Sequence, residues 1–142
     1  MLNEQKFKMN YWLIKTEPGN YSWEDLKKDK HTFWDGVRNY QARNNLKSMK
    51  NGDLCLFYHS VKEKSVIGVA KVIKEYYQDP TTDDDRWVAV DVELDTELKN
   101  RVTLDQIKSD SRLEQMVLVN NSRLSVQPVK NEEFDLIIGM GS

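Results

Sequence analysis

The sequence predicts an α+β fold, a mixed and mostly antiparallel β-barrel with short helices at its rim. Several segments rich in β-branched and aromatic residues are bounded by turn residues, which is typical of strands. Short helical segments separate them without the regular alternation of a parallel sheet. The 142 residues match the usual size of one domain. We therefore expect one compact unit, residues 10–142, preceded by a disordered leader or tag-like extension, residues 1–9.

The strand predictions rest on alternation of apolar and polar residues and on β-propensity. In the segment 87–94, Val88, Val90 and Val92 alternate with small or acidic residues, the pattern of a half-buried antiparallel strand. The other segments expected to form strands are residues 11–14, 54–58, 66–73 and 123–126.

The helix predictions rest on capping residues and apolar spacing. Ser22 is expected to cap one helix, and Thr103 and Gln106 form a capping box for another. The predicted helices cover residues 22–26, 41–49, 103–107 and the segment from residue 131 onward.

The residue counts exclude several kinds of site. One cysteine and two histidines leave no disulfide framework and little for a metal, and no glycine motif for a nucleotide cofactor occurs. Cys55 and His59 are four residues apart on one predicted strand, about 13 Å, which is too far for a nucleophile and its base. We expect no cofactor, Cys55 in the core and His31 in a solvated loop. No apolar run is long enough to span a membrane.

The net charge of −2 hides an uneven distribution along the chain. Residues 1–74 carry 14 Lys/Arg and 8 Asp/Glu, whereas residues 75–142 carry 7 and 15. The segment 36–52 holds four cations and no acid. Charge acts over a Debye length of about 8–10 Å, so only nearby charges matter at a binding surface. A local basic surface can therefore bind a polyanion even though the whole protein is mildly acidic. The acidic segment 79–85 is expected to be an exposed turn.

Aromatic and basic residues are interleaved in the first 60 residues, a composition typical of surfaces that stack nucleobases and hold phosphates. Eight of the fourteen aromatic residues are Trp12, Tyr21, Trp23, Phe33, Trp34, Tyr40, Phe57 and Tyr58. Trp12 and Trp23 are expected in the core, since one lies on an apolar strand and the other on an amphipathic helix. Trp34 lies in the loop-like segment 33–39, where no strand or helix period explains a large ring. We therefore expect Trp34 to serve binding more than core packing.

Several segments follow one another in a recognisable order: YWLIKTEP (11–18), YSW (21–23), WDGVRNYQARNNL (34–46), GD (52–53), FYHS (57–60) and SRLSVQPV (122–129). In this order they closely resemble the EVE domain family, over about residues 10–140. The resemblance implies a PUA-like fold, related to the YTH and ASCH domains. It also implies a non-catalytic module that reads a modified, flipped base in an aromatic pocket.

The implied ligand is DNA with a base such as 5-methylcytosine or 5-hydroxymethylcytosine, or RNA with a modified nucleotide. Residues implied to bind the base are Trp34, Tyr58, His59, Ser60, Asn39, Lys15, Thr16, Glu17 and Ser122. Residues implied to bind phosphate are Arg38, Arg43 and Arg123. The chain departs from the expected pattern in having no glycine between Leu26 and Trp34. The acidic segment 79–85 would repel a phosphate chain if it lay beside the pocket.

Two other classes of function stay open from the residues. An enzyme acting on modified nucleotides would use His59 as general base. The carboxylate of Glu17 is the candidate for orienting its imidazole ring. A protein-interaction domain would present the basic face to an acidic partner. The oligomeric state and the choice between DNA and RNA are open as well. The expected location is the cytoplasm of a bacterium, or the nucleus if the source is a eukaryote.

Overall fold

The computed structural model describes residues 9–142, so the predicted leader lies outside the described residues except for exposed Met9. The strands are β1 (Tyr11–Thr16), β2 (His31–Trp34), β3 (Leu54–His59), β4 (Ser65–Gln78), β5 (Val88–Thr103) and β6 (Val126–Val129). The helices are α2 (Trp23–Asp29), α3 (Tyr40–Ser48), α4 (Leu104–Ser109), η1 (Ser111–Leu113), α5 (Val117–Asn120) and α6 (Asn131–Met140).

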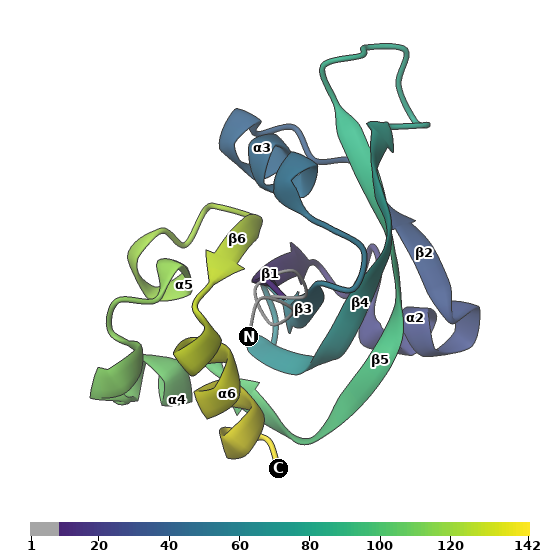
Figure 1. Cartoon of the computed structure of the whole chain (residues 1–142). Helices are drawn as coiled ribbons and strands as arrows, with labels where there is room; N and C mark the ends of the chain where they lie inside the picture. Colours follow the sequence, from purple (N-terminus) through teal and green to yellow (C-terminus); the bar gives the residue numbers. More distant parts are fainter. Residues whose placement is uncertain (1–8) are drawn as a thin grey trace, which may run out of the picture.

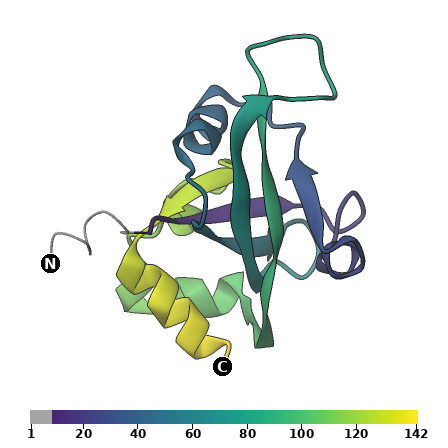
Figure 2. The same cartoon turned by 45° about the vertical axis from the view of Figure 1, so that its right-hand side comes forward.

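The six strands form one curved sheet in the order β2-β5-β4-β3-β1-β6 (Figure 1). Only β1 and β3 pair in parallel, and the other neighbours are antiparallel. The longest pair, β4 and β5, contains several shifts of register, and such bulges increase the local twist of a sheet. Figure 2 shows α3 near one end of the sheet and α4 and α6 near the other. The mixed, mostly antiparallel α+β fold is thus confirmed.

The predicted closed barrel is wrong. The edge strands β2 and β6 do not pair with each other in residues 9–142, so the sheet stays open. Each edge strand is only four residues long. The backbone of β6 is engaged instead by helix α3, because the Asn45 side-chain amide donates a hydrogen bond to the Val126 carbonyl, 2.7 Å away. A side chain therefore occupies an edge that closure of a barrel would require.

Side chains from the sheet contribute to two buried clusters because successive residues of a strand point to opposite faces. Trp12 and Ile14 belong to one cluster, while Leu13, between them, belongs to the other. The first cluster also contains Trp23 and Cys55, which confirms the core predictions for Trp12, Trp23 and Cys55. Burial raises the pKa of the Cys55 thiol, so the thiol stays protonated and inert.

The capping predictions for α2 and α4 are confirmed. Ser22 and Asp25 form a capping box on α2, and Thr103 and Gln106 form one on α4. The predicted strand 123–126 is displaced by three residues from the observed β6. Strand β2 was not predicted, and it begins at His31, which was expected in a loop. In residues 9–142, no helix has the length and apolar character needed to cross a membrane.

Candidate nucleic-acid interface

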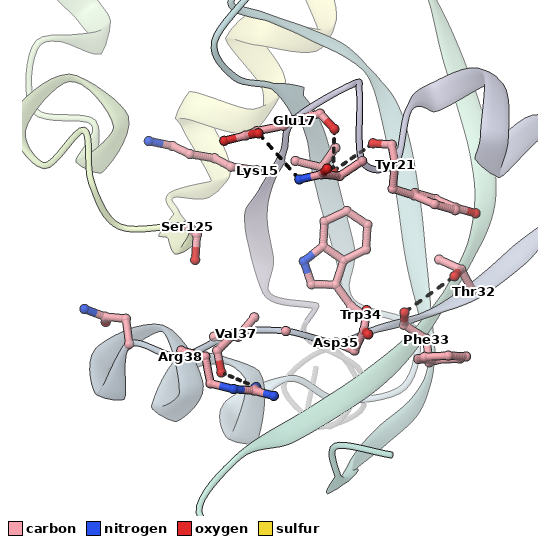
Figure 3. Close-up of a pocket in the computed structure, with 14 residues that line it drawn as sticks. Lys15, Glu17, Tyr21, Thr32, Phe33, Trp34, Asp35, Val37, Arg38 and Ser125 are labelled. Atoms are coloured by element: carbon pink, nitrogen blue, oxygen red, sulfur yellow. Dashed lines mark hydrogen bonds between the residues drawn. The ribbon is translucent and has the colours of Figure 1, made fainter. Parts of the chain in front are cut away.

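A pocket of about 600 Å³ lies between the end of β1, strand β2 and the loop that joins β2 to α3 (Figure 3). The strand order places β1 and β2 on different parts of the curved sheet, and the loop spans the space between them. The predicted site residues that line the pocket are Lys15, Thr16, Glu17, Trp34, Arg38 and Asn39. Half of the predicted set therefore comes together around one hollow.

Trp34 forms the inner wall of this pocket. It is the last residue of β2 and only 7% exposed. Its indole meets the rings of Phe57 and Tyr21 edge to face, at centroid distances of 5.6 and 6.4 Å. Figure 3 shows the indole nitrogen on the edge of the ring that faces Ser125, which also lines the pocket. Trp34 thus packs against the core on one side and lines the pocket on the other.

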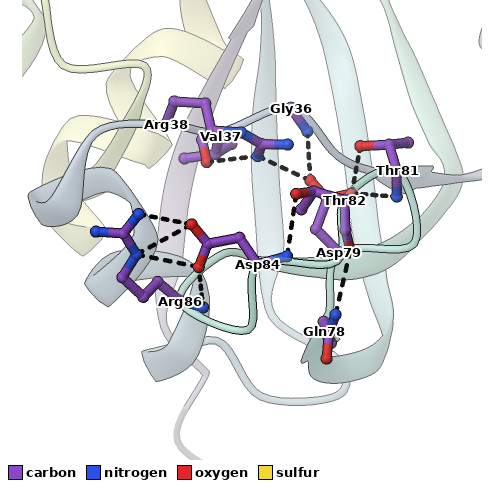
Figure 4. A network of polar contacts seen from close by, with 9 residues as sticks. All are labelled: Gly36, Val37, Arg38, Gln78, Asp79, Thr81, Thr82, Asp84 and Arg86. Carbon is purple, nitrogen blue, oxygen red and sulfur yellow. Dashed lines mark hydrogen bonds and ion pairs between the residues drawn. The ribbon is translucent and has the colours of Figure 1, made fainter.

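The loop after Trp34 is held by a buried carboxylate, Asp79 (Figure 4). Asp79 accepts hydrogen bonds from the Gly36 backbone at 2.9 Å and the Arg38 guanidinium at 3.0 Å. It also accepts from the backbone and hydroxyl of Thr81, at 2.7 and 2.6 Å. Gly36 has a φ of +77°, a conformation that favours glycine. These bonds fix the floor of the pocket.

Burial alone would raise the pKa of Asp79, but the hydrogen bonds from Thr81, Gly36 and Arg38 outweigh it and lower the pKa to about 2. The prediction that segment 79–85 is an exposed turn is therefore wrong for Asp79, which is fully buried. An Asp followed by Pro and Thr is typical of a turn in which the carboxylate accepts from the backbone two residues on, and this signal could have identified it.

The predicted phosphate-binding residues differ in how their charges are balanced. The Arg38 guanidinium forms an ion pair with Asp79 and lies 5.5 Å from the centroid of the Trp87 ring. Arg43 contacts neutral acceptors, the Asn44 side chain at 2.7 Å and the Arg86 carbonyl at 3.3 Å. In residues 9–142 no ion pair involves Arg43 or Arg123. Their positive charges are therefore better placed than that of Arg38 to meet a phosphate.

Lys15 is held at the rim of the pocket. Its ammonium donates a hydrogen bond to the Ser122 carbonyl and lies 5.8 Å from the centroid of the Tyr58 ring. Burial and the nearby charge of Lys64 lower the pKa of Lys15. The Ser122 carbonyl thus orients the Lys15 side chain. Ser122 itself does not line the pocket.

Three other predicted base contacts lie away from the pocket. Tyr58 is 2% exposed and packs in the second buried cluster. The backbone N–H of Ser60 donates to the Thr16 carbonyl at 2.9 Å, but Ser60 itself does not line the pocket. His59 is buried, and its Nε2 accepts a hydrogen bond from the Trp23 backbone at 3.0 Å. The structure does not bring these residues to the pocket.

The hydrogen bond from Trp23 also bears on the enzyme hypothesis. Burial, followed by the charge of Arg101, lowers the pKa of His59, which favours the neutral ring. A neutral imidazole that accepts at Nε2 carries its proton on Nδ1 and has no free basic nitrogen. His59 therefore joins β3 to the start of α2 and is poorly arranged to act as a general base.

Several pocket residues were missed by sequence reasoning. They are Asn20, Tyr21, Thr32, Phe33, Asp35, Gly36, Val37 and Ser125. Phe33 is the clearest case because it is 46% exposed and borders the pocket, although Figure 3 shows its ring turned away from Trp34. Its exposure could not be predicted, since β2 itself was not recognised. Tyr21 contributes as the edge-to-face neighbour of Trp34.

The sequence profile of the EVE domain matches residues 10–140. The chain is a member of the EVE domain family. Thymocyte nuclear protein 1 of Mus musculus is 39% identical over 92% of this chain and 73% of its own length. Among solved structures, a protein from Agrobacterium tumefaciens has a TM-score of 0.91 and 43% identity, covering 94% of this chain and 93% of that one.

Two further structures resemble this EVE domain. The human THYN1 protein in complex with 5-methylcytosine-containing DNA superposes with a TM-score of 0.87 at 36% identity, covering 94% of this chain and 98% of that one. ASCH from Zymomonas mobilis has a TM-score of 0.58 at 13% identity, covering 93% of this chain and 96% of that one. The second likeness is one of fold alone.

Proposed function

We propose that this EVE domain binds DNA and holds one unstacked, modified cytosine, such as 5-methylcytosine, in the pocket at Trp34. The observation that carries the proposal is the pocket itself, a hollow of about 600 Å³ between a rigid indole and a pinned loop. Its volume lies in the usual range for small-molecule sites, about 300–1,000 Å³. The human THYN1 protein, of the same fold, was solved with DNA that contains 5-methylcytosine.

Different residues bind the base and the phosphates. Trp34 forms the inner wall and presents its indole N–H to the base. Arg43 and Arg123 meet the phosphates on either side, whereas Arg38 keeps the loop in place through Asp79. Extruding a base costs a few kcal/mol, and stacking returns about 1–3 kcal/mol per base, so phosphate contacts are needed as well. Affinity for a lone base should therefore be weak.

Changing Trp34 is expected to remove the preference for the methylated base. One buried methyl group contributes about 0.8 kcal/mol, which corresponds to about a fourfold preference in Kd. Trp34→Ala should reduce this ratio to about one. Because the indole also packs on Phe57 and Tyr21, Trp34→Phe is the variant to rely on, since it keeps an aromatic ring in the core but withdraws part of the apolar wall that buries the methyl group. The measurement is the Kd for matched methylated and unmodified oligonucleotides.

Arg43→Ala is the matched control for this experiment. It should weaken methylated and unmodified DNA alike and reduce the salt slope by about one, as loss of a single phosphate contact predicts. An unchanged methylation ratio in folded Trp34→Phe would contradict the assignment of the pocket. Equal binding of RNA oligonucleotides would extend the ligand class, and binding of neither nucleic acid would overturn the proposed function.

A further inference from the structure

The loop between β3 and β4, residues 60–64, presents an apolar side chain at a strained position. Val61 has a φ of +73° and is 62% exposed. The Lys62 N–H donates to the Ser60 carbonyl at 3.0 Å, which closes a three-residue turn around Val61. A β-branched residue at positive φ is sterically unfavourable, and such outliers cluster at ligand-contacting sites. Neither packing nor solubility explains a valine here.

This loop starts at the wall of the base pocket. Strand β3 runs parallel to β1, and His59 lies opposite Thr16 in the register. The next residue, Ser60, donates its backbone N–H to the carbonyl of Thr16, which itself lines the pocket. Val61 follows directly. The exposed apolar tip is therefore two residues along the chain from a strand end that pairs with the pocket wall.

The surroundings of Val61 carry an excess of positive charge. Lys62 and Lys64 follow it in the same loop, are exposed, and take part in no ion pair within residues 9–142. Val61 and Lys64 border a second hollow of about 840 Å³. Its charged residues are Glu63, Lys64, Arg101, Asp105 and Lys108. One of the two acids is already neutralised, because Glu63 pairs with Arg101 at 2.6 Å.

We propose that Val61 is a wedge that enters the base stack of duplex DNA at the gap left by the base held in the pocket, with Lys62 and Lys64 on the adjacent phosphates. The inference rests on the proposed function. Apolar side chains that insert between base steps are an established way to hold a distorted duplex, and extrusion of a base leaves such a gap. The turn around Val61 presents the side chain to the duplex instead of to the core.

The test compares duplex with single-stranded DNA, since only the duplex has a gap to fill. Asparagine tolerates positive φ, so Val61→Asn keeps the turn but removes the apolar surface. We expect it to weaken binding of a duplex containing 5-methylcytosine by about tenfold and to leave the methylated single strand within about twofold. Val61→Leu, which stays apolar, should retain most of the duplex affinity. The melting temperature of Val61→Asn should not fall, because the strain at Val61 is relieved.

A second measurement reports the gap directly. With 2-aminopurine next to the methylated cytosine in the duplex, fluorescence should rise on binding of the unaltered protein and rise less with Val61→Asn. Unchanged duplex affinity in Val61→Asn, or an equal loss for both forms of DNA, overturns the wedge. If the unaltered protein shows no preference for methylated DNA in either form, the proposed function fails instead, so the two failures are distinguishable.

Discussion

Replacing Gly68 with alanine is expected to destabilise the protein by about 3 kcal/mol or more, lowering Tm by about 10 °C. A Cβ at Gly68 would lie 2.4 Å from Cη2 of Trp23 and 2.7 Å from the Thr96 carbonyl oxygen. Neither neighbour can move easily. Trp23 is 1% exposed, packs against Phe57 at 5.2 Å, and is tied to β3 through His59. Thermal unfolding followed by circular dichroism measures the effect.

Gly19→Ala provides the matched control. A Cβ at Gly19 would have no heavy atom within 4 Å, and the residue lies in the turn after β1. Its Tm should stay close to that of the unaltered protein. Equal stability of the Gly68 and Gly19 variants would show that Trp23 does not pack as described.

Replacing Asp79 with asparagine is expected to cost about 2–4 kcal/mol. Each carboxylate oxygen accepts two hydrogen bonds, one set from Thr81 and the other from Gly36 and Arg38. Whichever way the amide turns, its NH₂ group must face donors. Breaking a fully buried ion pair usually costs about 3–5 kcal/mol. We expect a smaller cost here because the Arg38 side chain is 40% exposed, so solvent weakens the pair. Chemical denaturation gives the free energy of unfolding directly.

The same carboxylate predicts a dependence of stability on acid. Its pKa is about 2 in the fold, below the ordinary value of 3.8, so the unfolded chain binds a proton more readily. The contribution of Asp79 is therefore complete above pH 4 and is lost as the pH falls from about 4 to 2. Asp79→Asn should lose less stability over this interval than the unaltered protein. Asp84→Asn, which breaks the more exposed pair with Arg86 in the same loop, should have a smaller effect on Tm at neutral pH. Equal effects of the two substitutions would contradict the role of Asp79.

Local signals predicted the fold where the interaction is itself local. The N-cap at Ser22 and the capping box at Thr103 involve residues three apart, and both occur as predicted. The alternation in 87–94 identified the first half of β5, because each side chain there faces either core or solvent. Strand β2 lacks such a pattern: it is four residues long and pairs with β5 some 60 residues further along the chain. Closure of the sheet depends on two such edges, and no local pattern indicates whether they meet.

In the candidate site as well, long-range contacts could not be predicted from the sequence. Trp34 was expected in a loop because no strand or helix period explained a large ring there. The structure instead places it at the end of β2, 7% exposed and within the first buried cluster, where it also lines the pocket. Tyr58 and His59 are adjacent to the pocket wall in the strand register, but their side chains are buried elsewhere. Asp79 reaches Arg38 from more than 40 residues away. The strain at Val61 is a backbone property that the residue type gives no reason to expect.

The most direct test of the account follows the four tryptophan indole N–H groups by ¹H–¹⁵N NMR during titration with a short oligonucleotide containing 5-methylcytosine. Trp12 donates to Asp53 at 2.9 Å, and the buried Trp23 nitrogen faces away from solvent, so both should change little. The Trp34 signal should shift most, and more with the methylated than with the unmodified oligonucleotide. A Trp34 signal that stays in place while the oligonucleotide binds would contradict the pocket as the site of the base.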